Sequence, residues 1–401
     1  DHKKIGITSR GVWVAVARHF RELGLNVATD PITVIGIGDM SGDVFGNGML
    51  VSSHLKLIAA FNHLHIFIDP QPDPLKSYEE RQRLFQLPRS NWTDYNPLCI
   101  SHGGGVFERS AKSIKLTPEM KQIFHLNDDA LTPNELIVAI LKAPADLLFN
   151  GGIGTFFKAS TEDHGDVLDR GNDAIRVNAN ELKAKVIAEG GNLGMTQLAR
   201  IEYALHGGVV NADFIDNSAG VDCSDHEVNI KILLNQLLST KKLTLAARNQ
   251  LLKKMPDEVA QLVLQDNYDQ TQIISLETHS VHQKMDMFRQ YMSDLEKRGR
   301  LNRQLEFLPT DTEMMTRKTN NHPLTRPEIA VLLAYSKMYL KKDLLQCSML
   351  EEPYFNKYLF SAFPRELSQR YEILLKRHRL RKEIIATQLS KSIVDRMGIH
   401  F

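Results

Sequence analysis

The first predicted element is an amphipathic helix near the start of the chain. Its apolar face is defined by residues at three- and four-residue spacing: Trp13, Val16, Phe20 and Leu23. We expect Thr8 or Ser9 to cap this helix, because both side chains can accept a hydrogen bond from a free backbone N–H. Gly24 is expected to end it.

The following segments predict the beginning of a parallel sheet. Residues 32–38 form a short apolar run that ends in glycines, which is typical of a buried strand. Residues 49–61 contain several alanine and leucine residues and predict a helix, and residues 64–69 predict a second strand. Two strands joined by a helix form a βαβ unit, so we expect these strands to be parallel.

Further short apolar runs continue this alternation to about residue 225. They predict strands at 98–100, 146–149, 185–188 and 214–215, with helices at 134–141 and 195–205. The sequence therefore predicts an α/β fold, with a Rossmann-like, doubly wound and mostly parallel sheet. The polar and acidic stretch 161–170 is expected to be a surface excursion.

After residue 225 the strand signals give way to long amphipathic stretches. They predict helices over residues 230–252, 259–276, 281–305 and 366–397. Thr325 is expected to cap another helix, with Glu328 three residues later completing a capping box. We therefore expect two domains, an α/β domain over residues 1–228 and an all-α C-terminal region over residues 229–401.

Composition narrows the function classes. The 401 residues carry a formal net charge of +1, so no overall field favours nucleic acid or a membrane surface. Cys99, Cys223 and Cys347 are far apart and predict neither a disulfide framework nor a metal site. This cysteine pattern favours a reduced, cytoplasmic setting. No apolar run is long enough to cross a bilayer, and no signal peptide opens the chain. Because the chain begins at Asp1 without methionine, we expect it to be an internal piece of a longer protein.

A glycine-rich turn at the end of the first predicted strand is the main candidate for cofactor chemistry. It comprises Gly36, Gly38, Asp39, Met40 and Ser41. The first glycine permits a tight turn, and the second allows the backbone to approach a pyrophosphate at a helix N-terminus. Ser41 stands where the usual pattern has a third glycine. The alternative is a structural loop that binds no ligand.

Other candidate ligand residues follow the later predicted strands. Asp69 ends the second predicted strand, where a carboxylate accepts hydrogen bonds from the adenosine ribose and repels a 2′-phosphate. Asn150, Gly151 and Gly152 follow one later strand, and two further asparagines, Asn192 and Asn217, follow others. Ligands in doubly wound sheets bind beyond the carboxyl ends of the strands, although each of these loops is also compatible with an ordinary turn.

Three weaker patterns each have a structural explanation that involves no ligand and no catalysis. The run from His102 to Gly105 is either a ligand loop or a plain glycine turn. Cys223 beside His226 suggests a nucleophile, but neighbours in sequence seldom face one another productively. The basic stretch 376–382 is better explained as a solvated helix face or a partner surface than as an RNA site.

Several segments resemble the glutamate dehydrogenases, in the order in which that family has them. They are residues 7–12 (ITSRGV), 183–192 (KAKVIAEGGN) and 217–224 (NSAGVDCS). The forms at 38–49, 216–227, 324–328 and 379–389 are similar to the large bacterial NAD-specific enzymes. The resemblance covers nearly the whole chain.

This resemblance implies oxidative deamination of L-glutamate to 2-oxoglutarate and ammonia, with hydride transfer to NAD. It implies that Gly36 and Gly38 face the pyrophosphate and that Asp69 faces the adenosine ribose. By the same resemblance, Asn192 and Asn217 lie near the nicotinamide and its ribose. Thr8 matches a position that contacts the nicotinamide amide, and Ser224 matches one that contacts the distal carboxylate of the substrate.

The catalytic lysines and aspartate of the family belong to a preceding domain. Their segments, including a lysine-glycine-glycine motif, have no counterpart in this sequence. We therefore expect no catalytic residue and no metal site in this chain, which would bind NAD without oxidising glutamate. Its expected partners are the missing N-terminal domains of the same polypeptide, in a homo-oligomer.

Two rival functions remain open from the sequence. A dehydrogenase for another amino acid would share the fold and the cofactor loops but would lack the long helical tail after residue 240. A non-catalytic NAD-sensing or interaction module would use the helices as its working part.

Overall fold

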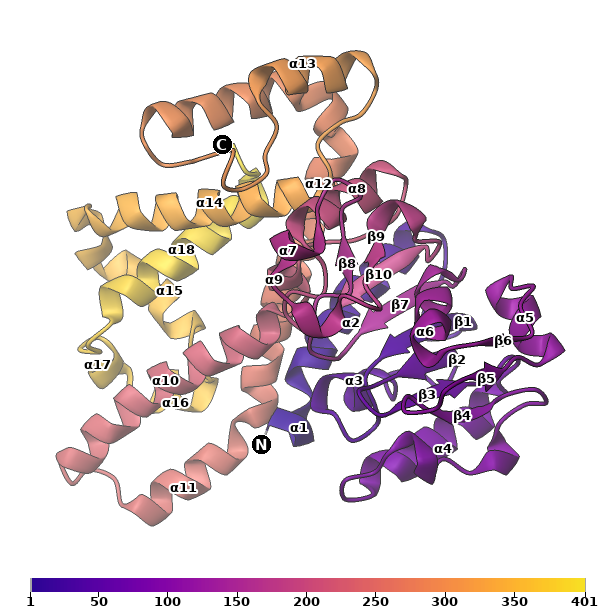
Figure 1. Ribbon diagram of the computed structural model, residues 1–401. Helices are drawn as coiled ribbons and strands as arrows, with labels where there is room; N and C mark the ends of the chain where they lie inside the picture. Colours follow the sequence, from indigo (N-terminus) through magenta and orange to yellow (C-terminus); the bar gives the residue numbers. More distant parts are fainter. Residues whose placement is uncertain (1, 401) are drawn as a thin grey trace. The chain divides into compact units, whose positions relative to one another are not determined.

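The computed structural model describes residues 2–400, which form two units (Figure 1). The α/β unit contains the chain up to Ser218 together with Thr325–Pro327. The helical unit contains Ala219–Leu324 and the chain from Glu328 onward. The chain therefore leaves the α/β unit earlier than the predicted boundary after residue 228, and it returns to that unit once.

A six-stranded sheet of order β10-β7-β1-β2-β3-β4 forms the centre of the α/β unit. The parallel strands are β1 (Ile32–Ile37), β2 (Leu55–Phe61), β7 (Leu147–Asn150) and β10 (Val186–Glu189). The antiparallel strands are β3 (His65–Ile68) and β4 (Gly105–Glu108). The predicted class, a mostly parallel doubly wound sheet, is confirmed.

The predicted helix over residues 49–61 is wrong, because this segment contains β2. Almost all of β2 is buried, so its apolar run shows no alternation and resembles a helix segment. The helix between β1 and β2 is the short α3 (Asp43–Gly48). Strand β2 turns directly into the antiparallel β3, because the Asn62 side chain accepts hydrogen bonds from the N–H groups of Leu64 (2.9 Å) and His65 (2.8 Å).

Two apolar layers cover the sheet, one on each face. On one face, α2 (Ile7–Glu22), α3 and α4 (Pro74–Gln86) pack against residues such as Val34 and Phe149. On the other face, α5 (Pro118–Phe124), α6 (Pro133–Lys142) and α8 (Gln197–Leu205) pack against residues such as Ile35 and Leu148. Neighbouring strand residues thus point to opposite layers, as the pleat requires.

Helix α2 begins one residue before the predicted cap. Gly6 is the N-cap residue, with a positive φ of 58° and no side-chain cap. Thr8 and Ser9 lie inside the first turn, so the predicted caps are wrong. The Ser9 hydroxyl instead donates to the carbonyl of Val44 and ties α2 to α3.

The other predicted elements of this unit divide into two groups. Strands at 146–149 and 185–188 and helices at 134–141 and 195–205 are confirmed by β7, β10, α6 and α8. The predicted strand at 98–100 is wrong, because Asn96 caps a 3₁₀ turn over Pro97–Cys99. The predicted strand at 214–215 is part of the short helix α9 (Asp213–Asp216). Two-residue strands form two small sheets, β5 (Ile114–Lys115) with β6 (Ala130–Leu131) and β8 (Phe157–Lys158) with β9 (Val177–Asn178).

The helical unit contains helices and no strand within its described residues, as predicted. Its helices are α10 (Ser218–Ser239), α11 (Leu245–Lys254), α12 (Pro256–Lys297), α13 (Asp311–Thr319), α14 (Arg326–Leu345), α15 (Asn356–Ser361), α16 (Arg365–Arg370), α17 (Glu372–Leu375) and α18 (Arg381–Met397). None of the described helices is long and apolar enough to cross a membrane.

Predicted helix boundaries in this unit differ from the observed ones in three places. The predicted helix at 230–252 is broken by a turn, because Thr244 caps α11. The predicted helices at 259–276 and 281–305 form one helix, α12, which continues through the polar residues between them and ends at Lys297, eight residues before the predicted end. Buried Glu277 makes this possible, since it pairs with Lys284 (2.9 Å) and accepts from the N–H of Ile399 (3.1 Å). The predicted last helix is divided among α16, α17 and α18.

Candidate functional site

The candidate site is the edge of the sheet at which the four parallel strands end. The chain passes from β1 to β2 on one side, and later to β7 and β10 on the other side. The strand order therefore reverses between β1 and β7. In doubly wound sheets, ligands bind beyond the carboxyl ends of the strands at such a reversal, and this place in the fold is called the crevice below.

Backbone hydrogen bonds attach the loops of this edge to the strands beside them. The N–H of Gly38 donates to the carbonyl of Phe61 (2.8 Å), and that of Gly151 donates to the carbonyl of Ile37 (2.9 Å). The N–H of Gly190 donates to the carbonyl of Asn150 (2.8 Å). The loops after β1, β7 and β10 thus form one connected rim.

A buried phenylalanine explains the glycines of this rim. A Cβ on Gly36, Gly38 or Gly151 would lie 2.3, 2.8 or 2.7 Å from side-chain atoms of Phe45. Gly38 also has a φ of 137°, which L side chains rarely adopt. Phe45 is fully buried and meets the ring of Trp92 edge-on at 5.9 Å. These glycines are therefore required by internal packing, and their contact with a pyrophosphate stays a prediction.

Asp39 organises the turn after β1. One carboxylate oxygen accepts from the N–H of Ser41 (2.9 Å), its hydroxyl (2.5 Å) and the N–H of Gly42 (3.1 Å). The other oxygen accepts from the Asn62 amide (2.9 Å) at the end of β2. Met40 is buried in the apolar layer, so its side chain does not face the crevice. Asp39 therefore presents its carboxylate between the ends of β1 and β2.

Asp69 lies away from this edge. Because β3 is antiparallel to β2, the N–H of Asp69 bonds the carbonyl of Ile58 (2.9 Å), three residues before β2 ends. Its side chain is fully buried and accepts from the hydroxyl (2.5 Å) and the N–H (3.1 Å) of Ser101. Burial raises the pKa of Asp69. The parallel arrangement on which its predicted ribose contact depended is thus wrong, and Asn62 holds the corresponding place at the edge.

The remaining predicted site residues of the α/β unit differ in how far they are buried. Asn150 is fully buried; its oxygen accepts from the N–H of Gly152 (3.2 Å), while its nitrogen has no hydrogen-bond partner. Asn192 is exposed on the loop after β10. Asn217 donates to the carbonyl of Gly190 (2.5 Å). Thr8 is half-buried in the first turn of α2.

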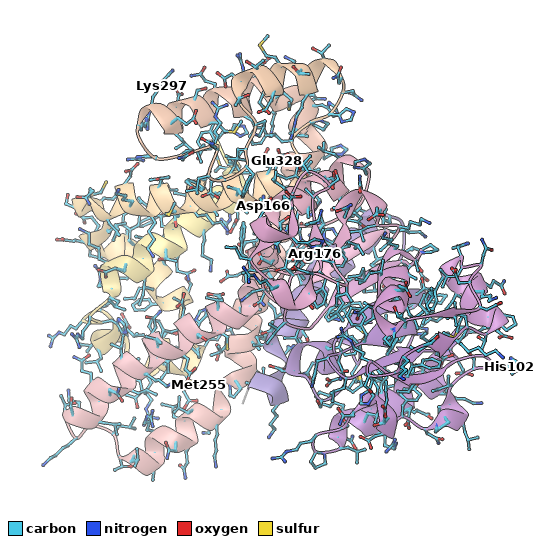
Figure 2. All side chains as sticks on the ribbon, in the orientation of Figure 1. His102, Asp166, Arg176, Met255, Lys297 and Glu328 are labelled. Atoms are coloured by element: carbon cyan, nitrogen blue, oxygen red, sulfur yellow. The ribbon has the colours of Figure 1, made fainter. Side chains whose placement is uncertain are left out.

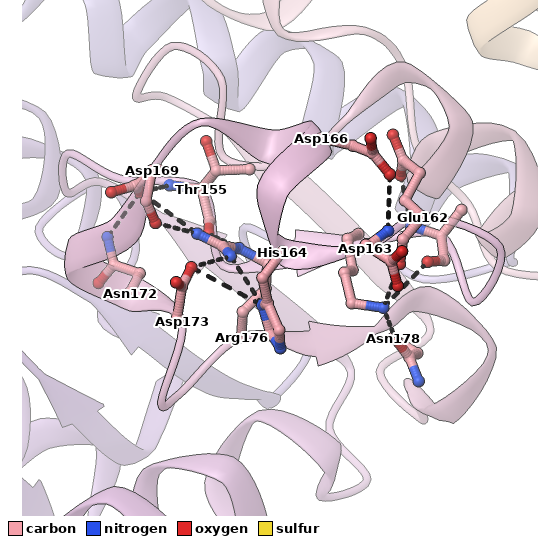
Figure 3. Close-up of polar contacts among 12 residues, drawn as sticks. Thr155, Glu162, Asp163, His164, Asp166, Asp169, Asn172, Asp173, Arg176 and Asn178 are labelled. Atoms are coloured by element: carbon pink, nitrogen blue, oxygen red, sulfur yellow. Dashed lines mark hydrogen bonds and ion pairs between the residues drawn. The ribbon is translucent and has the colours of Figure 1, made fainter.

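Residues 161–170 are mostly exposed, as predicted for a surface excursion, and a cluster of polar contacts lies beside them (Figure 3). Arg176, whose side chain is fully buried, donates to the carbonyl of Thr155 (2.8 Å) and pairs with Asp173 (2.6 Å). Asp169 accepts from the N–H of Thr155 (2.7 Å). This cluster holds the loop that follows Gly152. No sequence pattern indicates this cluster, because its members come together only in the folded chain.

A second buried cluster supports the loops after β10 and α9. Glu189 is fully buried and accepts from the Arg200 guanidinium (2.6 Å) and from the N–H of Met195 (3.0 Å). Asp213 accepts from the N–H of Leu193 (2.8 Å) and lies 3.3 Å from Arg200. The exposed loop that contains Asn192 is therefore held in place by the side chains of Glu189, Arg200 and Asp213.

Ser224 and the weaker candidates lie in the helical unit or make internal contacts. Ser224 is exposed on α10, with its hydroxyl 3.4 Å from the carbonyl of Gly220. His226 bonds the carbonyl of Ala362 (3.0 Å), and burial raises the pKa of the Cys223 thiol, so neither is arranged for nucleophilic catalysis. In the basic stretch, Lys376 pairs with Glu372 (2.6 Å).

A charged cluster in the helical unit resembles a metal site in composition. Ligand atoms of Asp222, His226 and Asp266 all lie within 4.8 Å of one another. Lys391 forms an ion pair with Asp266, and its ammonium supplies a positive charge to the carboxylates. Burial and the hydrogen bond to Asp266 raise the pKa of Asp222 to about 8. We therefore interpret this cluster as part of the helix packing.

The fold and the rim of loops define a doubly wound unit with a ligand crevice of the dinucleotide-binding class. Residues 1–277 match the family described as bacterial NAD-glutamate dehydrogenase, catalytic domain, and residues 321–401 match the family described as glutamate dehydrogenase, C-terminal. The chain belongs to the bacterial NAD-glutamate dehydrogenase family.

Curated relatives extend this finding over the whole chain. It is 56% identical over 401 residues to the NAD-specific glutamate dehydrogenase of Pseudomonas aeruginosa and 48% identical over 407 residues to that of Mycobacterium tuberculosis. In both cases 100% of this chain is covered but 25% of the relative, so the chain spans about a quarter of their length. Among solved structures, Plasmodium falciparum glutamate dehydrogenase 2 matches with a TM-score of 0.37 and 14% identity, over 67% of this chain and 46% of that one. That likeness is too low to carry an argument.

Proposed function

We propose that this chain is the NAD-binding part of a glutamate dehydrogenase, which oxidises L-glutamate to 2-oxoglutarate and ammonia. The observation that supports this most is the rim of hydrogen-bonded loops at the reversal between β1 and β7, in a chain that belongs to this family. NAD, when bound, supplies the acceptor for the substrate hydride. The residues of this chain bind and orient the cofactor.

The residues present fit a dinucleotide. Asn150 offers a fully buried amide nitrogen without a hydrogen-bond partner at the end of β7. Such a donor is costly to leave unpaired, which supports a ligand acceptor nearby. The carboxylate of Asp39 and the amide of Asn62 lie at the ends of β1 and β2, the place of the adenosine ribose in this class of fold.

We propose that Asp39, with Asn62, makes the selection for NAD that the sequence analysis gave to Asp69. A carboxylate at this edge accepts hydrogen bonds from ribose hydroxyls and repels a 2′-phosphate. Asp69 is fully buried on an antiparallel strand and lacks that access. Thr8, Asn192 and Asn217 remain our candidates for the nicotinamide end, and Ser224 for the substrate carboxylate.

The proton-transferring groups are assigned to the rest of the full-length polypeptide. Positioning of the cofactor is the part of the reaction that the described residues support. The matched C-terminal family also disfavours a separate sensing module, because helices of this kind occur in the enzymes themselves. A homo-oligomeric full-length enzyme stays a prediction.

Calorimetric titration of the chain with NAD, then with NADP, tests the proposal. We expect selective binding of NAD and no glutamate oxidation by the chain alone. The full-length polypeptide should oxidise glutamate with NAD. Absence of NAD binding to both the chain and the full-length polypeptide would overturn the assignment of a cofactor site. Oxidation of glutamate by the chain alone would contradict the assignment of the proton-transferring groups to the rest of the polypeptide.

A further inference from the structure

The segment Thr325–Pro327 belongs to the α/β unit but is far in sequence from the rest of that unit. In sequence it opens α14, whose remaining residues belong to the helical unit. In the structure it completes the α/β unit, and Arg326 is 7% exposed there. A buried arginine has to be paired, so its partners show what this segment does.

Arg326 contacts two polar side chains of the α/β unit. Its Nε donates to the Asn211 side-chain oxygen (3.1 Å), and one terminal nitrogen pairs with Glu22 on α2 (3.3 Å). It lies beside the fully buried His19, whose pKa is held well below the usual value by burial and by the Arg326 and Arg18 charges. His19 is therefore neutral and adds no second positive charge beside Arg326.

The bond to Arg326 fixes which way the Asn211 amide faces. A guanidinium can donate hydrogen bonds but cannot accept them, so the amide oxygen has to point toward Arg326. The amide nitrogen then points the other way and donates to Asp216 (2.9 Å), which is 1% exposed. The second oxygen of Asp216 accepts from the N–H of Glu189 (3.0 Å).

This chain of bonds ends at two loops of the cofactor crevice. Glu189 is followed by Gly190, and Asp216 is followed by Asn217. The Asn217 amide donates to the carbonyl of Gly190 (2.5 Å), so the two loops are also joined to each other. Arg326, Asn211 and Asp216 are all buried, so the geometry of this chain of bonds is sensitive to the loss of its first member.

We propose that Arg326 is a positioning residue for the cofactor: through Asn211 and Asp216 it holds Asn217 and the Gly190 loop in the geometry that binds the nicotinamide end. This inference rests on the proposed function. It assigns to the start of α14 a role in the cofactor site, which lies far from it in sequence.

The test compares Arg326→Gln and Arg326→Lys with the unchanged full-length polypeptide. Arg326→Gln removes the charge and the reach to both partners, so the KM for NAD should rise on the order of tenfold, with kcat less affected. Arg326→Lys keeps the charge but loses the planar guanidinium that reaches Asn211 and Glu22 through separate nitrogens, so the affinity for NAD should fall two- to fivefold. Calorimetric titration with NAD gives the same comparison without turnover.

Arg317→Gln is the matched control. Arg317 pairs with Glu328 (2.7 Å), which is fully buried in the first turn of α14 and is labelled in Figure 2. Both members of this pair belong to the helical unit. Its loss should lower thermal stability and leave the KM for NAD within about twofold of the unchanged protein.

The outcomes separate this inference from the proposed function. If the unchanged protein fails to bind NAD, the proposed function is wrong. If it binds NAD and folded Arg326→Gln binds it equally well, the positioning role is wrong and the function stands. Should Arg326→Gln not fold, Arg326→Lys decides: an NAD affinity between two- and fivefold weaker at unchanged melting temperature supports the role, and an unaltered affinity refutes it.

Discussion

The two units use buried charge in different ways. At the crevice of the α/β unit, carboxylates of Asp39, Asp213 and Asp216 accept hydrogen bonds from the backbone of loops. The buried Glu189 of that unit also pairs with Arg200, but it too accepts from a loop N–H, that of Met195. In the helical unit, buried charges pair mainly with other side chains, as in Lys391 with Asp266 and Arg317 with Glu328. Charge therefore sets loop shape in one unit and helix packing in the other. Changes in the first should alter ligand binding, and changes in the second should alter stability.

The largest expected effect is on the packing beneath the crevice. Phe45→Ala removes the fully buried ring that Gly36, Gly38 and Gly151 enclose, so the free energy of unfolding should fall by about 3–5 kcal/mol. Chemical denaturation measures this loss. Phe307→Ala, at a side chain 46% exposed, is the control and should have a small effect. A similar loss in both variants would contradict the packing role of Phe45.

The next effect concerns the charged core of the helical unit. Lys391→Met leaves the Asp266 carboxylate without its cation in a largely buried place, at a cost of about 3 kcal/mol. Thermal denaturation should show the loss, and the affinity for NAD should not change. The control is Lys376→Met, because that lysine forms a half-exposed pair with Glu372. A marked loss of NAD affinity in Lys391→Met would remove the contrast between the units.

A pH dependence should arise from the carboxyl pair of the same core. Burial, and the hydrogen bond that protonated Asp222 donates to the Asp266 carboxylate, raise the pKa of Asp222 to about 8. Its favourable contribution is complete below the unfolded value of about 4 and is lost as pH rises through 8. Asp222→Asn keeps a donor that does not titrate.

The free energy of unfolding, measured against pH, should therefore separate these two proteins. From pH 4 to pH 9 the unchanged protein should lose several kcal/mol of stability relative to Asp222→Asn, at about 1.4 kcal/mol per pH unit up to pH 8. If the free energies of unfolding of the two proteins changed in parallel from pH 5 to 9, Asp222 would not be protonated in the folded state.

The smallest expected change in free energy is in cofactor selection. Asp39→Asn should reduce the preference for NAD over NADP about tenfold, since the carboxylate at the β1–β2 edge is lost. Asp69→Asn should alter stability and leave the preference unchanged, because Asp69 is bonded to Ser101 away from that edge. Titration of both variants with both cofactors measures this. The reverse result would restore Asp69 as the selecting residue.

Sequence reasoning succeeded where the signal was local. Strands β1, β7 and β10 and helices α6 and α8 have apolar runs whose length and spacing suffice to identify them. Strand β2 was missed because it is buried on both faces and contains alanine and leucine. The direction of β3 depended on the turn at Asn62, and the wrong direction placed Asp69 at the wrong edge.

The candidate site was predicted in part for the same reason. Loops at the ends of parallel strands follow from the order of the elements, so Gly38, Asn150 and Asn192 were named. The residues beneath them were not, because their partners are distant in sequence. Arg326 is 115 residues from Asn211 and 304 residues from Glu22. No local pattern records such pairs.

The discontinuity of the α/β unit has a consequence for synthesis of the protein. The ribosome adds about 5–20 residues per second, and about a hundred residues separate Ser218 from Thr325. The growing α/β unit therefore waits on the order of ten seconds for the arginine that fixes Asn211 and Asp216. During that interval its last piece is absent, and the nascent unit has to remain folded around an incomplete interior.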